Sequence, residues 1–284
     1  GGRRAACSNP AASRGEVDAP PADRLVRMVR SRREGVAFTV VVTVLVALGA
    51  LPMLLVLALS GAPSSLLLAT VLAALPVGPL VGCYLWLDRY EPEPRSLLAL
   101  GLLWGGFVAT AGALLVQGIG GLFVGFTEAA SLAVVAPVTE EASKGAFLVL
   151  LLWLRRAELD GILDGIVYAG MVGIGFAFVE NILYLAAAYN GTDGMGPGGT
   201  EALTTTFVLR CLVSPFAHPL FTTFIGVGVG IAVGSRSGAV RWLAPLGGYV
   251  LAVVTHALWN GSAFIGFGGF VVRFTSISSR RAEA

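Results

Sequence analysis

Long apolar runs separated by short polar segments dominate the chain. Most of these runs approach or exceed the roughly 20 residues that a helix needs to cross about 30 Å of hydrocarbon. The pattern therefore predicts an all-α, polytopic bundle of about seven transmembrane helices. The predicted spans lie near residues 36–59, 65–87, 97–124, 128–154, 162–188, 203–234 and 242–270.

The composition agrees with a protein that has the lipid bilayer as its solvent. Hydrophobic residues make up 56% of the chain and charged residues 13%, whereas soluble domains carry about a quarter charged residues. The net charge is +2 and the arginines fall in short clusters between apolar runs, which argues against a nucleic-acid partner. Three cysteines without C-x-x-C spacing indicate neither a disulfide framework nor a cysteine zinc site.

Polar segments flank the apolar region. Residues 1–35 are rich in Pro, Ala and Arg, a composition that predicts a disordered cytoplasmic tail. A transmembrane domain is expected over 36–272, followed by a short polar tail at 273–284. The chain begins with Gly1 rather than Met, which leaves open whether its true start is present.

Basic residues occur in every second loop, which predicts a cytoplasmic N-terminus. They precede the first span and follow the second, fourth and sixth spans, while the alternate loops contain no Lys or Arg. Arg273, Arg280 and Arg281 would then lie outside, against the rule. Two explanations stay open: the short tail is tolerated there, or the last apolar stretch, interrupted by glycines, re-enters the membrane and returns.

Three ionisable residues lie in the middle of the fourth span. Glu140, Glu141 and Lys144 fall within five positions, and each costs roughly 2.5 to 3.5 kcal/mol at a helix centre in the bilayer. They must therefore face protein or water. Glu140 and Lys144 are spaced i, i+4 and can pair on one helix face. The alternative is a buried ion pair that only holds helices together. That role needs one carboxylate, and Glu141 is a second.

The fifth span adds Glu180 and Asn181, one turn after Phe176, and Glu180 has no cation nearby in sequence. Carboxylates brought together in a desolvated site cannot all ionise comfortably, so at least one should retain a proton. Such a group can act as a general acid or base near neutral pH.

Both histidines of the chain lie in apolar spans. A lone membrane histidine often only bonds one helix to another, but His218 and His256 together with buried carboxylates indicate a site. His256 and Asn260 are spaced i, i+4 and share a helix face, as two donors to one oxyanion require. With the N-terminus inside, all these positions fall between the middle of the membrane and its outer leaflet.

Other hydrolase patterns are absent from the sequence. Neither Gly-x-Ser-x-Gly nor His-Glu-x-x-His occurs. Histidine and carboxylate suit a divalent metal such as zinc, so metal-dependent and metal-free hydrolysis both stay open. The candidate metal ligands are Glu140, Glu141, Glu180, His218 and His256.

At these residues the sequence resembles the PrsW family, within a wider group that includes the CAAX prenyl proteases and bacteriocin-immunity-type membrane proteins. The resemblance covers roughly residues 75–265, and the order of its motifs makes it specific. The motifs are Asp-Arg-Tyr-Glu-Pro-Glu-Pro at 88–94, Glu-Glu-x-x-Lys at 140–144, Phe-x-x-x-Glu-Asn at 176–181, His218, and His-x-x-x-Asn at 256–260.

The resemblance implies an intramembrane endopeptidase of the bacterial cell membrane that cuts single-span, anti-sigma-factor-like membrane proteins. It assigns Glu140 as the base that activates water, Glu141 and Glu180 as partners or metal ligands, and His256 with Asn260 as oxyanion stabilisers. His218 would orient water or substrate, and Lys144 would fix Glu140. Phe176 and Asn181 would support the site, and 88–94 would form a structural loop at the inner face that could also position substrate.

Two other classes compete with a protease. Intramembrane Glu, His and Lys also build proton relays in transporters, although no convincing internal repeat is visible. A non-catalytic scaffold or immunity-type protein would keep the fold without the chemistry. The order of the motifs favours the protease.

Overall fold

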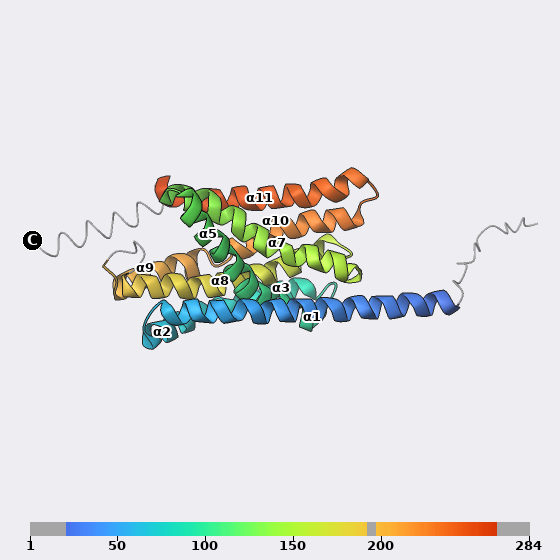
Figure 1. Ribbon diagram of the computed structural model, residues 1–284, viewed down its shortest axis with the longest axis horizontal. Coiled ribbons are helices and arrows are strands. Elements are labelled where there is room, and N and C mark those ends of the chain that lie inside the picture. Colours follow the sequence, from blue (N-terminus) through green and yellow to red (C-terminus); the bar gives the residue numbers. More distant parts are fainter. Residues whose placement is uncertain (1–20, 192–196, 266–284) are drawn as a thin grey trace, which may run out of the picture.

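The computed structural model describes residues 21–191 and 197–265 as a bundle of long helices (Figure 1). Every regular element in these two ranges is helical. The first half contains α1 (Pro21–Leu59), α2 (Pro63–Ala74), α3 (Val77–Asp88), α4 (Arg95–Leu103), η1 (Trp104–Ala109), α5 (Thr110–Val124), α6 (Glu128–Ala130) and η2 (Ser131–Val135). The second half contains α7 (Ala136–Leu154), η3 (Arg156–Glu158), α8 (Ile162–Asn190), α9 (Thr200–Phe207), η4 (Val208–Val213), α10 (Ala217–Gly234) and α11 (Gly238–Ile265).

The predicted polytopic helical fold is confirmed. Among the described residues, six helices are long and apolar enough to cross a membrane: Arg33–Leu59, Pro63–Asp88, Arg95–Val124, Ile162–Asn190, Thr200–Gly234 and Gly238–Ser262. The fourth predicted span, formed by η2 and α7, carries the charges of Glu140, Glu141 and Lys144 and is therefore less apolar than the other six. With it, the bundle has the seven long helical segments expected.

The start of the first helix requires a correction. Helix α1 begins at Pro21, so the prediction of disorder up to residue 35 is wrong for 21–35. Arg, Leu and Met, which favour helix, extend the span into this polar segment, and proline suits a first helical turn. Helix α11 runs unbroken from Gly238 to Ile265, so no return occurs within it. Residues 1–20 and 266–284, including the short polar tail, lie outside the described residues.

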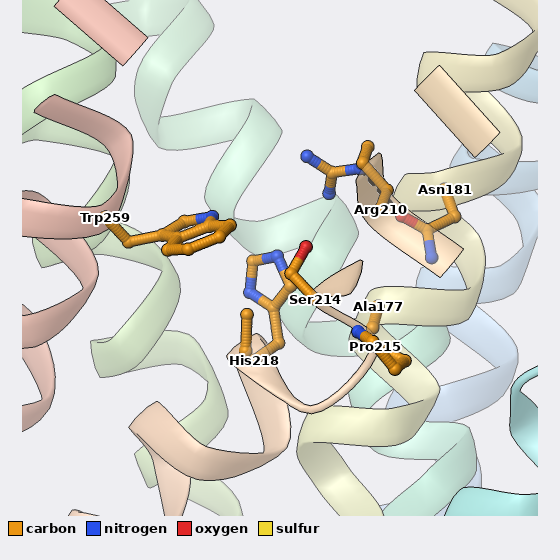
Figure 2. Close-up of a pocket in the computed structure, with 8 residues that line it drawn as sticks. Ala177, Asn181, Arg210, Ser214, Pro215, His218 and Trp259 are labelled. Atoms are coloured by element: carbon orange, nitrogen blue, oxygen red, sulfur yellow. Dashed lines mark hydrogen bonds between the residues drawn. The ribbon is translucent and has the colours of Figure 1, made fainter. Parts of the chain in front are cut away.

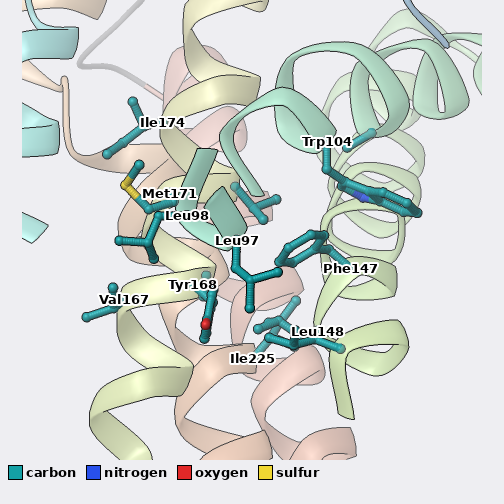
Figure 3. Close-up of a cluster of buried hydrophobic side chains, with 14 of the residues drawn as sticks. Leu97, Leu98, Trp104, Phe147, Leu148, Val167, Tyr168, Met171, Ile174 and Ile225 are labelled. Atoms are coloured by element: carbon teal, nitrogen blue, oxygen red, sulfur yellow. The ribbon is translucent and has the colours of Figure 1, made fainter. Parts of the chain in front are cut away.

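Helix α8 lies at the centre of the bundle. In its apolar segment 78% of the residues are buried, against 11% in the apolar segment of α1. An aromatic cluster joins η1 and α7 to it, with the Phe147 ring centroid 5.8 Å from that of Trp104 and 6.4 Å from that of Tyr168 on α8 (Figure 3). The indole of Trp104 also donates a hydrogen bond to the carbonyl of Ser143 (3.0 Å). This core fixes α7 against α8 beside the ionisable residues.

Glycines allow α8 and α10 to touch through their backbones. A Cβ atom at Gly226 would lie 2.0 Å from the carbonyl oxygen of Gly165, and one at Gly165 would lie 2.1 Å from the carbonyl oxygen of Gly226. No larger residue fits at either position without separating the helices, as expected where small residues line a membrane helix interface. A Cβ atom at Gly173 of α8 would likewise lie 2.6 Å from the Cα of Pro219, so the start of α10 also lies against α8.

The acidic loop at 88–94 ties the end of α3 to α8. The Asp88 carboxylate accepts a hydrogen bond from the backbone N–H of Glu93 (2.9 Å), and Glu93 accepts one from the Tyr168 hydroxyl (2.5 Å). Burial raises the pKa of Glu93 to about 7. These contacts support the expected structural role of the loop.

Candidate active site

Four helices bring their ionisable residues to one level of the bundle. Glu140 and Glu141 lie near the start of α7, and His218 lies in the first turn of α10. Glu180 and His256 lie beyond the middle of α8 and α11. Because α7 and α10 run opposite to α8 and α11, these positions coincide in depth, as the sequence predicted.

Lys144 lies at the centre of the cluster and is fully buried. Its ammonium nitrogen is 2.8 Å from Glu141 Oε1 and 3.7 Å from Glu140 Oε2. The predicted Glu140 pair therefore exists, but the direct hydrogen bond of Lys144 goes to Glu141. The ammonium also lies 3.8 Å from the centroid of the Phe176 ring, a cation–π contact that a desolvated cation favours.

Glu141 is held as an acceptor by three donors. Besides Lys144, the hydroxyl of Thr222 donates to its Oε2 (3.1 Å), and Nδ1 of His256 lies 3.0 Å from its Oε1. A carboxylate that receives these donors is best satisfied when ionised, so Nδ1 of His256 carries the proton. Its Nε2 then presents a lone pair, 3.8 Å from Glu140 Oε2.

His218 links the two halves of the cluster. Its Nδ1 is 3.1 Å from the Lys144 ammonium, which can only donate, and its Nε2 is 2.7 Å from Glu180 Oε2. His218 therefore accepts at Nδ1 and donates at Nε2. The result is a continuous polar chain across three helices, from Glu180 on α8 through His218 on α10 to Lys144 and Glu141 on α7.

Arg210 supplies the cation that Glu180 lacks in sequence. It lies in the π-helical turn η4, and its Nη2 pairs with Glu180 Oε2. Its Nε donates to the side-chain oxygen of Asn181 (2.7 Å), and its guanidinium carbon lies 4.0 Å from the centroid of the Tyr184 ring. Arg210 thus holds both polar residues of the Phe-x-x-x-Glu-Asn motif.

A cavity of about 10 Å³, near the size of one water molecule, adjoins His218 (Figure 2). Its polar lining comes from Asn181, Arg210, Ser214 and Trp259 as well as His218. These residues come from α8, η4, the bend before α10, and α11. A water bound there would have several polar partners beside the cluster.

Glu140 is the least satisfied member of the cluster. It is 6% exposed, and its Oε2 has no hydrogen-bond partner in the described part of the chain. A buried oxygen left without a partner is costly, so such an atom calls for a functional explanation. It is free to bind a water, a substrate group or a metal.

Asn260 lies at the edge of this arrangement. Its side-chain amide donates to the carbonyl of Leu132 (2.9 Å), which joins α11 to η2. One amide hydrogen is used in that bond, and a second is left to donate. Asn260 therefore retains a donor for the oxyanion role that the sequence predicted.

Comparison with known proteins decides the family. Residues 93–278 match the family described as PrsW family intramembrane metalloprotease. The chain belongs to this family. Two similar proteins are both called Protease PrsW. The one from Geobacillus kaustophilus (strain HTA426) is 33% identical over 153 residues, 51% of this chain and 58% of that relative. The one from Bacillus subtilis (strain 168) is 29% identical over 204 residues, 68% of this chain and 80% of that relative.

No solved structure matched the chain. The resemblance to the PrsW family that the motifs indicated is confirmed. The prediction of an integral membrane protein is confirmed as well.

The metalloprotease description of the PrsW family raises the question of a metal ion. Ligand atoms of Glu140, His218 and His256 lie within 4.8 Å of one another. The unpartnered Oε2 of Glu140 and the free Nε2 of His256 suit a zinc ion, and Glu141 orients His256 as outer carboxylates orient metal-bound histidines. His218 would have to exchange its contact with Lys144 for the metal. The donor set therefore fits, whereas Glu141 and Glu180 already hold other side chains.

Sequence reasoning missed Arg210 and Thr222. Arg210 was detectable, because a charged residue within the apolar run 203–234 is expensive and calls for a partner. The rule that basic residues mark cytoplasmic loops used only the arginines in the loops. Thr222 left no signal, since threonine is common in membrane helices.

Proposed function

We propose that this PrsW-family protein is an intramembrane endopeptidase that hydrolyses a peptide bond of a single-span membrane protein. The observation that supports this most strongly is the buried Oε2 of Glu140. It accepts no hydrogen bond from the described residues and lies 3.7 Å from the Lys144 ammonium and 3.8 Å from Nε2 of His256. A scaffold would gain nothing from leaving that atom without a hydrogen bond.

In the proposed reaction Glu140 is the general base. Its carboxylate takes a proton from water as the water oxygen attacks the peptide carbonyl carbon, and it returns the proton to the amine nitrogen as the C–N bond breaks. The second amide hydrogen of Asn260 donates to the developing oxyanion. The polar chain through Lys144 fixes Glu141, and Glu141 in turn orients His256.

For His256 we propose a role other than the oxyanion stabiliser expected from the sequence. In the neutral imidazole that donates from Nδ1 to Glu141, Nε2 carries a lone pair and accepts rather than donates. As the alternative to metal-free hydrolysis with Glu140 as the base, that lone pair supports a metal ion held by His256, Glu140 and His218. A zinc ion bound there would supply Lewis acidity toward the carbonyl oxygen.

The membrane setting follows from the topology. Basic loops after α3, α7 and α10 support a cytoplasmic N-terminus, and with it a position of the cluster between mid-membrane and the outer leaflet. The family resemblance supports a bacterial cell membrane and an anti-sigma-factor-like substrate.

The test expresses the protein and its Glu140→Gln variant with a panel of single-span membrane proteins that carry tags at both ends. Fragments that require Glu140 would establish a protease and its substrate class. Asn260→Ala should slow the same cleavage about a hundredfold, the usual effect of losing one oxyanion donor. Equal fragments from all three inserted proteins would contradict the proposal.

A further inference from the structure

A cavity of about 480 Å³ lies along the seam between α7 and α11, with α10 behind it. Its volume is within the range of ligand-binding pockets. Its lining is almost entirely apolar, and the α7 side is open to the surroundings. Ala142 and Ala146 are exposed there, as are Val149 (55%) and, at the cytoplasmic end of α7, Trp153 (82%).

This groove ends at the candidate active site. Glu141 forms part of its wall, and the buried carboxylate of this residue binds Lys144 and His256. The other cavity described above is water-sized and polar, and lies beside His218. A large apolar route and a small polar pocket therefore adjoin one polar cluster.

The exposed face of α7 in the groove suits a second helix. Ala142 and Ala146 are four residues apart, a spacing of small side chains that lets two membrane helices approach closely. Gly145, also in the lining, lies one position from this stripe. The small residues thus lie next to Glu141 in the lining of the groove.

Few polar contacts hold the seam closed. Within the described residues, three hydrogen bonds from α11 side chains cross it: Tyr249 to the Val138 carbonyl (3.0 Å), His256 to the Glu141 carboxylate (3.0 Å), and, at its outer end, Asn260 to the Leu132 carbonyl of η2 (2.9 Å). The Tyr249 hydroxyl lies in the groove, and its bond to the Val138 carbonyl crosses the seam two residues before Glu140. Movement of one tyrosine would free both a carbonyl oxygen and a hydroxyl beside the site.

We propose that this groove receives the membrane-spanning segment of the substrate protein, which enters laterally between α7 and α11 past Tyr249. This inference rests on the proposed function. A polypeptide that unwinds for cleavage needs partners for its backbone N–H and C=O groups inside the bilayer. The Val138 carbonyl and the Tyr249 hydroxyl would provide them. A lipid acyl chain has no hydrogen-bond donor or acceptor that could pair with either group.

Photocrosslinking tests the occupant. A photoreactive residue is placed at Ala146 or, as the control, at Leu251, which is 45% exposed on α11 and does not line the groove. The probe is a tagged single-span reporter that the wild-type protein cuts, with Glu140→Gln preventing its loss. We expect at least tenfold more adduct from position 146 than from 251. Equal adducts at both positions, or adducts with phospholipid alone, would overturn the groove as the substrate site.

Cleavage provides the second readout. Ala146→Trp should slow cutting of the bilayer-embedded reporter at least tenfold, while Leu251→Trp should change it less than twofold. Both variants should cut a short water-soluble peptide with the same cleavage sequence at the wild-type rate, which shows an intact site. Unchanged reporter cleavage by Ala146→Trp would refute the groove alone. No cleavage of any reporter by the wild type would refute the proposed function, and this inference with it.

Discussion

The pair between Arg210 and Glu180 makes a quantitative prediction about stability. Their side chains are 20% and 13% exposed and lie on different helical segments. Removing one partner of a buried ion pair costs about 3–5 kcal/mol because the other charge is left unpaired. The partial exposure of both groups places the expected loss at the lower end, about 3 kcal/mol, for Arg210→Met.

A double-mutant cycle isolates the interaction free energy between Arg210 and Glu180. Glu180→Gln should cost a similar amount, but adding it to Arg210→Met should cost little more, because the double variant contains no unpaired charge. The expected coupling is about 2 kcal/mol. Unfolding in detergent micelles, followed by circular dichroism against added denaturant, measures all four proteins. A coupling below about 0.5 kcal/mol would refute the pairing, and Arg210→Lys should retain part of the stability.

Three further perturbations test the packing, the acidic loop and the metal ligands. Gly226→Ala places a Cβ atom 2.0 Å from a backbone oxygen of α8 and should lower the free energy of unfolding by about 1–3 kcal/mol. Gly118→Ala, whose Cβ atom would have no other atom within 4 Å, should raise it by up to about 1 kcal/mol. The pKa of Glu93 is raised from 4.5 to about 7, so this residue binds its proton more tightly in the folded state. The free energy of unfolding should therefore fall as the pH rises from about 4.5 to 7. Denaturation curves of Glu93→Gln should show a weaker dependence on pH. His256→Phe should lower the zinc content of the purified protein, measured by elemental analysis, and an unchanged content would remove His256 from the ligands.

Much of the fold could be predicted from the sequence because apolar length is a strong constraint in a bilayer. The charged fourth span was recognisable because neighbouring apolar runs and alternate basic loops required a helix there. The start of α1 was not, since a polar segment rich in Arg and Ala can be either a tail or a helix extension. Local composition does not separate these two outcomes.

The sequence could predict which residues form the candidate site, but not which of them pair with one another. Charges inside apolar runs identified Glu140, Lys144 and Glu180, and the structure brings their side chains into one cluster. The i, i+4 rule favoured Glu140 as the partner of Lys144, yet the i, i+3 contact to Glu141 is shorter. Which carboxylate is satisfied depends on donors from other helices, such as Thr222, that no spacing rule reveals.

The rate of reporter cleavage by three purified proteins in liposomes is the most direct test of glutamate-dependent intramembrane proteolysis. The three are the wild type, Glu140→Gln, and Glu201→Gln, which alters an exposed glutamate in the first turn of α9. We predict equal cleavage within the membrane span by the wild type and Glu201→Gln, and background cleavage by Glu140→Gln. Cleavage by a folded Glu140→Gln protein at the wild-type rate would contradict the assignment.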